Sequence, residues 1–295
     1  MQEYQIIKMA DYSNDQIDRI RSLEQLCQIN DRSNLRVGID SLKAIGGDEA
    51  YLCLCGNRLI GFLSWYTSDG TEANINGMVH PNFRRKSVFN SLLKRALPEM
   101  QAKGIQVCRF RIPLNSEPGI GFIKHLGASF HTSEFSMNLQ QFQADASKRS
   151  SFILRLADVE DLEFMITCSS QAFGDSEAWT RIYFARTREP ERVSYIALDN
   201  LEPIGMIRVN YVSRDTAVIH DLCVLPLHQG KGYGRKILNG VVKLLLEQKC
   251  SIIRLGVVTD NRRALNLYHS IGFEVSSEFH YYVISINKTL LNTAK

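Results

Sequence analysis

The sequence lacks any cysteine or histidine pattern that would hold a disulfide framework or a zinc ion. Its seven cysteines are an odd number and include no C-x-x-C pair, and its seven histidines show no metal-ligand spacing. Cys53 and Cys55 alternate within an apolar segment, so we expect them to share one face of a strand as small core residues. We therefore expect no metal site, and the cysteine usage fits a reducing, cytoplasmic location.

Long apolar runs and concentrated charge are also missing. No segment approaches the ~18 apolar residues of a membrane-spanning helix. The first residues, MQEYQIIKMADYSND, include early acidic residues and no long apolar region, which does not fit an ordinary secretion signal. The net charge of +4 arises from 35 basic and 31 acidic residues and is spread evenly. We expect neither a membrane nor a nucleic-acid partner, because nucleic-acid binders normally concentrate their charge.

The chain that remains is ordinary for a globular protein and long enough for two domains. It has 295 residues, of which 44% are hydrophobic and 22% charged. It also repeats itself: VHPNFRRKSVFNSLLKRAL from Val79 aligns with VLPLHQGKGYGRKILNGVV from Val224, so that Pro81 matches Pro226, 145 positions later. Gly61 matches Gly205 at a separation of 144. Blocks in the same order indicate a tandem duplication with a polar linker, QADASKRSS, between the copies.

Each copy has the same order of expected elements. A first strand leads to one or two helices, a pair of strands follows, and then come a strand, a loop and a helix. Another strand, a short helix and a closing strand end the copy, the closing strands being FSMNL and YYVISI. Helices interleaved with strands predict an α/β (α+β) fold with a mixed sheet in each of two similar domains.

The segment HDLCVLPLHQGKGYGRKILNG in the second copy is the least ordinary of the chain. Val218–Val224 alternates and is rich in branched residues, which predicts a strand that ends at Pro226. From Tyr233 the apolar residues recur at helical spacing. Glycines at every second position between strand and helix let the backbone take unusual angles and approach a ligand closely. Free N–H groups and the positive end of a helix dipole suit a phosphate.

Other interpretations of this loop fit less well. G-x-G-x-G differs from the dinucleotide fingerprint G-x-G-x-x-G, and the P-loop pattern is absent. A dehydrogenase could use Asp260 to bind a ribose, but five residues separate Val224 from the first glycine, whereas a dinucleotide turn begins where the strand ends. The glycines could also serve only to make a tight entry into the helix.

Two motifs in the second copy resemble the GNAT superfamily of N-acetyltransferases. They are V-x-P-x-x-Q-x-x-G-x-G in Val224–Gly234 and N-x-x-A-x-x-x-Y-x-x-x-G-F in Asn261–Phe273. The resemblance implies two tandem GNAT-like domains, a degenerate one over 1–145 and a catalytic one over 151–295. It also implies a mixed, splayed sheet flanked by helices, with acetyl-CoA between the two strands that part.

The same resemblance implies which residues contact acetyl-CoA. Those expected to act through the strand backbone are Leu222, Cys223 and Val224. Those expected around the pyrophosphate are Gln229, Gly230, Lys231, Gly232, Tyr233, Gly234 and Arg235, and Asn261 is expected near the thioester.

Acetyl transfer from a thioester to an amine needs a neutral amine and a proton for the leaving thiolate. Tyr268 suits the second role, since a phenol stays protonated at neutral pH. His220 is the favoured base because its ordinary pKa lies near seven, and Asp221 is the second choice. Strand alternation predicts that His220 shares a face with Leu222 and Val224, while Asp221 points the other way. A base acting through water, or a structural histidine, stays possible, and Cys223 is expected to be a packed strand residue.

The expected function is direct transfer of an acetyl group from acetyl-CoA to a primary amine. The acceptor can be a small molecule or a peptide, and neither its identity nor the oligomeric state can be inferred. A non-catalytic acyl-CoA-binding or sensing protein is the alternative. We expect the first copy to be catalytically silent, because the repeat pairs His220 with Ile75, Gly232 with Ser87, Gly234 with Phe89 and Tyr268 with Phe122.

Overall fold

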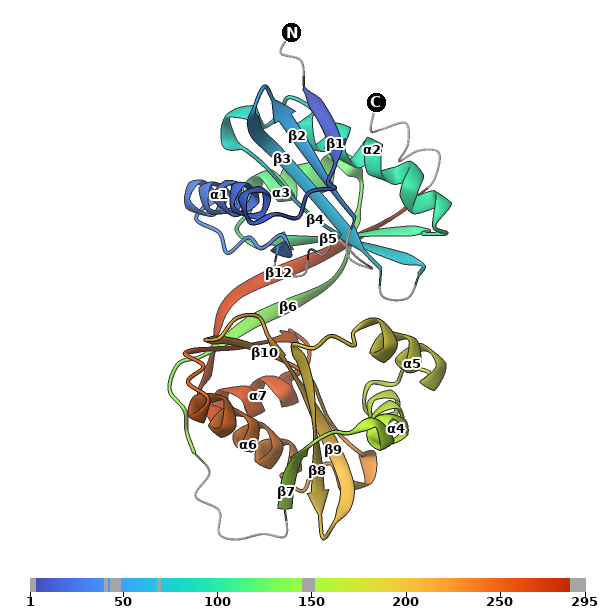
Figure 1. Ribbon diagram of the computed structural model, residues 1–295, viewed down its shortest axis with the longest axis vertical. Coiled ribbons are helices and arrows are strands. Elements are labelled where there is room, and N and C mark those ends of the chain that lie inside the picture. Colours follow the sequence, from blue (N-terminus) through green and yellow to red (C-terminus); the bar gives the residue numbers. More distant parts are fainter. Residues whose placement is uncertain (1–3, 40–41, 43–48, 68–69, 145–151, 287–295) are drawn as a thin grey trace. The chain divides into compact units, whose positions relative to one another are not determined.

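The computed structural model describes residues 4–39, 42, 49–67, 70–144 and 152–286, and these form two compact units (Figure 1). Unit 1 comprises residues 1–133 and 278–295, and unit 2 comprises residues 134–277. Each unit has its own core, and each is described separately below. The linker QADASKRSS lies largely outside the described residues.

Unit 1 is a mixed sheet with the strand order β1-β2-β3-β4-β5-β12. Its elements are β1 (Gln5–Lys8), α1 (Asn14–Asp31), β2 (Glu49–Cys55), β3 (Arg58–Tyr66), β4 (Glu72–Val79), η2 (Pro81–Phe83), α2 (Val88–Ala102), β5 (Val107–Pro113), α3 (Glu117–Leu126), the start of β6 (Ser129–Leu139) and the end of β12 (Phe273–Ser285). Strands β4 and β5 are parallel, and the other assigned pairs of this unit are antiparallel. The apolar faces of α1 and α2 pack against separate core clusters.

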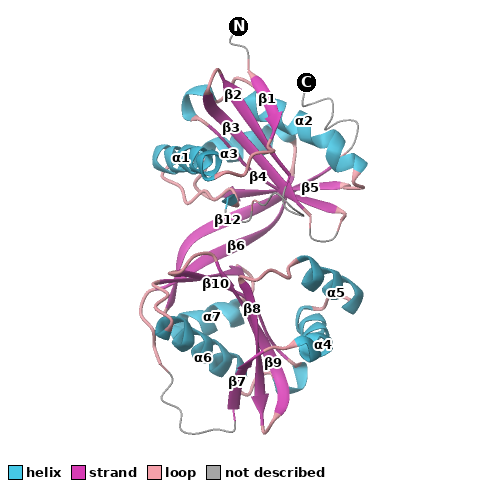
Figure 2. Cartoon of the chain, in the orientation of Figure 1, coloured by secondary structure: helices cyan, strands magenta, loops and turns pink. Residues whose placement is uncertain are grey.

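Unit 2 has the strand order β6-β11-β10-β9-β8-β7. Its elements are the main part of β6, β7 (Phe152–Leu156), η3 (Val159–Asp161), α4 (Leu162–Phe173), α5 (Glu177–Arg186), β8 (Arg192–Asp199), β9 (Glu202–Tyr211), β10 (Thr216–Val224), η4 (Pro226–His228), α6 (Tyr233–Glu247), β11 (Ile252–Val258), α7 (Arg262–Ile271) and the start of β12. Figure 2 shows α6 and α7 on one face of this sheet and α4 and α5 on the other. A core cluster fills the space beneath the helices on each face.

The closing strands are exchanged between the two copies of the repeat. In unit 1, β5 pairs with the second half of β12, with Val107 opposite Ser285. In unit 2, β11 pairs with β6, with Arg254 opposite Asn138. The segment FSMNL therefore completes the sheet of unit 2, and YYVIS belongs to unit 1. The units thus differ from the ranges 1–145 and 151–295 expected from the sequence, because residues near the end of each copy pair with the other copy.

The fold class expected from the sequence is confirmed. The strand, loop and helix around the glycines appear as β10, η4 with its following loop, and α6, at the predicted positions. Helix α6 buries Ile237, Leu238, Val241, Val242 and Leu245 against β9 and β10, the stripe that its periodicity predicts.

Candidate active site

Strands β10 and β11 pair for only part of their length. They run parallel from Thr216 opposite Ile252 to Ile219 opposite Leu255, and no further pair between them is formed in the described residues. Strand β10 continues to Val224 while still pairing with β9 on its other side. The backbone from His220 to Val224 therefore has a hydrogen-bonding edge that β11 does not occupy, which a ligand with amide groups can use.

A β-bulge sits in β10 where the strands part. The register with β9 shifts between His220 and Cys223, and Asp221 adopts a left-handed conformation with φ 48°. Ile219 and Val224 both pack in the cluster under α6, whereas Cys223 packs in the cluster under α4. The alternation that placed His220 on the face of Leu222 and Val224 was therefore wrong, because the extra residue reverses the faces beyond it.

The bulge also brings His220 and Asp221 to the same side of the sheet. The Tyr183 hydroxyl of α5 donates to Asp221 Oδ2 at 3.1 Å, and Arg208 Nη1 lies 3.2 Å from the same oxygen. Arg208 is opposite His220 in the β9–β10 register. The sequence argument allowed only one of the two candidate bases to face this region, and the structure brings both to the α5 side.

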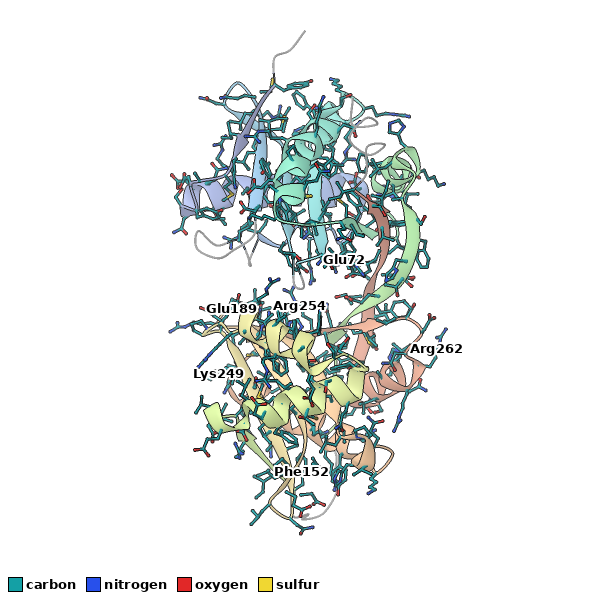
Figure 3. The ribbon with its side chains drawn as sticks, turned by 90° about the vertical axis from the view of Figure 1, so that its right-hand side faces the viewer. Glu72, Phe152, Glu189, Lys249, Arg254 and Arg262 are labelled. Atoms are coloured by element: carbon teal, nitrogen blue, oxygen red, sulfur yellow. The ribbon has the colours of Figure 1, made fainter. Side chains whose placement is uncertain are left out.

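Burial and surrounding charge act on His220 together. The pKa of His220 is lowered to about 4, mainly by burial; Arg192, Arg208 and Arg254 contribute to the lowering, and Asp221 opposes it. Of these residues, Figure 3 labels Arg254. His220 is therefore neutral at physiological pH and able to accept a proton. The lowered pKa also makes His220 a weaker base than an ordinary histidine.

This pKa predicts how the stability of unit 2 responds to acid. The folded-state pKa of His220 lies below the unfolded value of 6.5, so protons bind the unfolded chain preferentially. The stability that the neutral imidazole contributes is present above pH 6.5 and is lost as pH falls toward 4, with a slope of up to about 1.4 kcal/mol per pH unit. His220→Gln should flatten this loss in denaturant titrations, whereas His269→Gln, on the surface, should not. An equal loss of stability in acid for wild type and His220→Gln would contradict this prediction.

Arg208, Arg192 and Tyr183 were missed by the sequence analysis. Arg208 is 3% exposed on an otherwise apolar stretch of β9. A single arginine inside PIGMIRVNY is a signal that could have found it, since a buried charge needs a partner or a function. Tyr183 lies on α5, where it stacks on Trp179 with ring centroids 5.4 Å apart. No pattern in that helix distinguishes it from packing.

The glycine loop has the geometry of an anion site. Gly230 and Gly232 have φ of 78° and 84°, a conformation that favours glycine. Gly232 caps α6 without a side-chain hydrogen bond, and a Cβ there would meet no atom within 4 Å. Gln229 donates from its side-chain amide to Val224 O at 3.0 Å, which ties the loop to the end of β10. Exposed N–H groups at the start of a 15-residue helix are suited to bind phosphate.

The other loop residues differ in what their side chains do. Lys231 is exposed beside the glycines. Tyr233 donates its hydroxyl to Asp199, and Arg235 donates to Ser270 Oγ at 2.6 Å, which ties α6 to α7. Gly234 faces Leu267 of α7. In this arrangement the side chains of Tyr233 and Arg235 hold the loop, and its backbone and Lys231 are left for a ligand.

Tyr268 and Asn261 both belong to α7. Asn261 caps the helix by accepting from Ala264 N at 3.0 Å, so its side chain has a structural role. Tyr268 packs against the core cluster under α6 and edge-on to Phe273. Burial raises the pKa of its hydroxyl to about 12, so Tyr268 is protonated at neutral pH. Tyr268 and His220 thus come from opposite faces of the sheet, on either side of the strands that part.

Cys223 does not have the properties of a nucleophile. Its Sγ lies 3.6 Å from Cys168 Sγ inside the cluster under α4, and this contact together with burial raises the pKa of the thiol. A buried thiol is inert compared with a thiolate. The geometry favours the packing role expected from the sequence.

No metal cluster accompanies these residues. The described part of the chain contains no group of three or more histidine, cysteine or acidic side chains that could hold a metal ion. Within the same residues, no helix is both long and apolar enough to cross a membrane.

Unit 1 keeps the loop backbone but not the bulge. The register of β4 with β3 is regular from Tyr66 opposite Asn74 to Gly61 opposite Val79. The last parallel pair is Ile75 opposite Phe110, so Ile75 corresponds to Ile219 of unit 2. His220 therefore corresponds to Asn76, not to Ile75 as expected, because Asp221 is an additional residue in β10.

The caps of α3 and α7 correct a second residue correspondence between the two copies of the repeat. Helix α3 runs from the cap Ser116 to Gly127, and α7 runs from the cap Asn261 to Gly272. Both ends are 145 positions apart, so Tyr268 corresponds to Ile123 and not to Phe122. Neither Asn76 nor Ile123 offers the imidazole or hydroxyl of its counterpart.

Aromatic side chains occupy the region in unit 1 that corresponds to the parting strands of unit 2. Phe89, which replaces Gly234, lies so close to β4 that a Cβ on Gly77 would be 2.3 Å from its Cε2. Its ring is 4.8 Å from that of Phe122, which in turn lies 6.0 Å from Phe110 on β5. These rings lie between α2, α3 and the strands of unit 1, against the counterpart of the backbone that the resemblance assigns to acetyl-CoA in unit 2.

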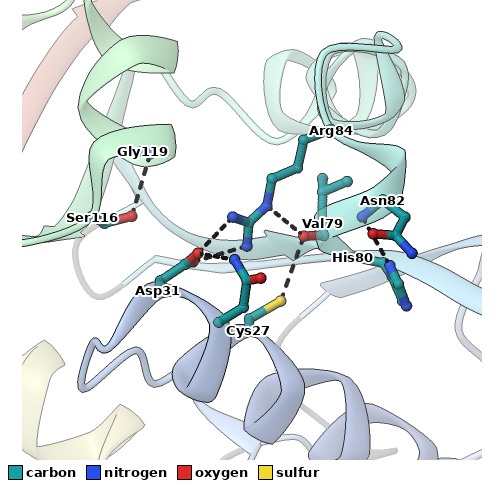
Figure 4. Close-up of polar contacts among 9 residues, drawn as sticks. Cys27, Asp31, Val79, His80, Asn82, Arg84, Ser116 and Gly119 are labelled. Carbon is teal, nitrogen blue, oxygen red and sulfur yellow. Dashed lines mark hydrogen bonds and ion pairs between the residues drawn. The ribbon is translucent and has the colours of Figure 1, made fainter.

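In the loop of unit 1, Arg84 is bound to other residues of the same unit (Figure 4). Arg84 donates from Nε to Val79 O at 3.0 Å, the same bond that Gln229 makes in unit 2. Its two Nη atoms bind Asp31 at 2.6 and 2.8 Å. Arg85 and Ser87 keep positive φ at the positions of Gly230 and Gly232. The backbone path has survived the loss of both glycines, while the charge of Arg84 is paired within the unit.

Known proteins resemble part of this sequence and nearly the whole fold. A family model described as the acetyltransferase (GNAT) family matches residues 156–273. The chain is 37% identical over 60 residues to thialysine N-epsilon-acetyltransferase of Bos taurus, which covers 20% of this chain and 35% of that protein. This chain spans about a third of the length of the curated relatives that it matches in this way.

Two solved structures resemble nearly the whole chain. A GCN5-related N-acetyltransferase from Sphaerobacter thermophilus has a TM-score of 0.78 at 17% identity, over 96% of each chain. A tandem GNAT protein from the clavulanic acid biosynthesis pathway has a TM-score of 0.71 at 16% identity, over 97% of this chain and 99% of that one. Residues 156–273 therefore match the GNAT acetyltransferase family, and the chain as a whole has the fold of a tandem GNAT protein.

Proposed function

We propose that unit 2 transfers an acetyl group from acetyl-CoA to a primary amine by direct attack, and that unit 1 is catalytically silent. The observation that carries the proposal is the combination of a strand edge left open beyond Ile219 with an exposed glycine loop at the start of α6. The open edge offers amide groups to the pantetheine arm, and the loop offers N–H groups to the pyrophosphate. The aromatic side chains of α2 and α3 that pack beside β4 support a silent unit 1.

The proposed roles follow from the chemistry of thioester aminolysis. The acceptor ammonium loses a proton to His220, directly or through water, and its nitrogen then attacks the thioester carbonyl carbon. A C–N bond forms, the C–S bond breaks, and the second amine proton leaves to solvent. Tyr268 gives the thiolate a proton, since its hydroxyl stays protonated. A strand N–H of Cys223 or Val224 stabilises the oxyanion. Asp221 serves mainly to hold Arg208 and Tyr183.

Gly232→Val tests the loop assignment. A valine at φ 84° is strained, and its side chain would project into the open space assigned to phosphate. We expect the dissociation constant of acetyl-CoA to rise at least about 10-fold, roughly the loss of one charge-assisted hydrogen bond. Calorimetry measures it, and circular dichroism checks the fold. Ser87→Val in unit 1 is the matched control, since Ser87 has the same backbone conformation, and it should leave the affinity unchanged. A normal affinity in Gly232→Val would refute the assignment.

A further inference from the structure

Two arginines of unit 2 have buried guanidinium nitrogens that lack a partner. The side chain of Arg208 is 4% exposed, and its Nη atoms bind Asp221 and Thr187. Its Nε is buried without a hydrogen-bond partner, and so is the Nε of Arg192. Such a buried donor costs about 1–3 kcal/mol and needs an explanation.

Both arginines lie on the sheet face that carries His220. Arg192 is opposite Asn210 in the β8–β9 register. It lies four residues before Ile196 on β8, so the two side chains share the face that packs under α4. Arg208 is two residues from Asn210 and directly opposite His220. The Arg208 guanidinium carbon lies 4.7 Å from the centre of the Phe184 ring and 5.6 Å from that of Tyr183. The two guanidinium groups thus lie beside the proposed base, beneath α5.

The local charge is positive. The charged groups that act most strongly on His220 are one carboxylate, Asp221, and three guanidinium groups. Asp221 is already engaged by Arg208 and by Tyr183, whose raised pKa keeps its phenol neutral. This potential disfavours an ammonium ion, so it promotes loss of the acceptor's proton. Arg254 also interacts with another group, so Arg192 and Arg208 set against Asp221 leave about one positive charge for a ligand to balance.

We infer that the acceptor amine carries a carboxylate, as an amino acid does, and that Arg192 binds this carboxylate beside Arg208 while the amine lies near His220. A carboxylate fits better than a phosphate monoester, because the site has about one unbalanced charge and a phosphate carries −1.5 to −2. Carboxylate is also the planar partner that guanidinium N–H groups bind best. The inference names the acceptor class for the proposed transfer and therefore rests on that function.

The test compares acceptors in matched pairs. Lysine, alanine and glutamate are each assayed against the corresponding α-carboxamide with acetyl-CoA, and products are identified by mass spectrometry. For at least one pair we expect wild-type kcat/KM to be about 10-fold to 100-fold higher for the carboxylate, mainly through KM. Arg192→Gln should bring the ratio close to one while the affinity for acetyl-CoA stays unchanged, and Arg192→Lys should restore part of the preference. Arg181→Gln, on the surface of α5, is the matched control and should keep the wild-type ratio.

A second measurement needs no variant. N-acetyl amino acids should inhibit wild-type turnover at least about 10-fold more strongly than their amides. Amides that equal or exceed carboxylates as acceptors, or a loss in Arg192→Gln that is the same for both members of a pair, would overturn the inference while leaving acetyl transfer intact. Acetyl-CoA binding without acetylation of any amine would instead remove the proposed function itself.

Discussion

Tyr268→Phe is expected to lower kcat about 10²-fold or more and to leave the dissociation constant of acetyl-CoA unchanged. The substitution removes one hydroxyl and little volume, so packing against Phe273 and the core under α6 should persist. The hydroxyl is the proposed proton donor to the thiolate, and general-acid catalysis contributes about 10² to 10⁴ in rate. Steady-state kinetics and calorimetry on the same preparation separate the two effects.

Tyr282→Phe provides a control for this substitution. Tyr282 belongs to the part of β12 that pairs with β5 in unit 1, so loss of its hydroxyl should leave kcat unchanged. If Tyr268→Phe weakened binding and turnover to the same extent, Tyr268 would be a packing residue. An undiminished kcat would assign the proton donation to another group.

The second large effect concerns the number of acetyl-CoA sites. Calorimetry should find one tight site per chain, because the aromatic rings of Phe89 and Phe122 occupy the counterpart region of unit 1. Replacing Gly230, Gly232 and Gly234 together by alanine should abolish this site, since two of them have positive φ and a methyl group would oppose the phosphate. Replacing Arg85, Ser87 and Phe89 by alanine should leave it intact. Two sites of similar affinity would contradict a silent unit 1.

Activity offers an independent check on unit 1. If unit 1 is only a scaffold, changes at Arg85 to Phe89 should leave turnover unchanged, and loss of both His220 and Tyr268 should abolish it. Turnover that survived the loss of His220 and Tyr268 but vanished on mutating the unit 1 loop would place the chemistry in the other copy.

The sequence predicted the parts of the fold that depend on local patterns. The strand before Pro226, the glycine loop and the amphipathic α6 are set by residues close together in the chain, and the structure confirms all three. The exchange of β6 and β12 could not be predicted in the same way. Both strands would alternate identically in either pairing, so only the assembled sheets decide the partner.

The bulge shows where sequence reasoning came close and failed. The repeat separation changes from 144 at Gly205 to 145 at Pro226, which marks one extra residue, and Asp221 is that residue. A prediction from simple alternation leaves out this extra residue and therefore places His220 on the wrong face of the sheet. Arg192 and Tyr183 were missed because their importance depends on strands and a helix brought together only by folding. The pKa of His220 likewise reflects burial and charges from three other strands.

One observable consequence of the proposed chemistry follows from this pKa. His220 is already neutral above about pH 5, so the rise of kcat/KM with pH should follow ionisation of the acceptor amine and show no separate limb near 6.5. Pairs of acceptors with different amine pKa values should shift the profile accordingly. A limb near 6.5 that is independent of the acceptor and disappears in His220→Gln would show that His220 keeps its ordinary pKa.

Acetylation of an amine by the purified chain is the most direct test of the account. The chain is incubated with acetyl-CoA carrying a ¹³C-labelled acetyl group and pooled amines, and labelled products are sought by mass spectrometry. The account predicts a labelled N-acetyl product with wild type and with Ser87→Val, and about 10²-fold less with Tyr268→Phe. Tight binding of acetyl-CoA with no labelled product from any pool, and an affinity that survives loss of both His220 and Tyr268, would contradict it and identify a CoA-binding protein without transferase activity.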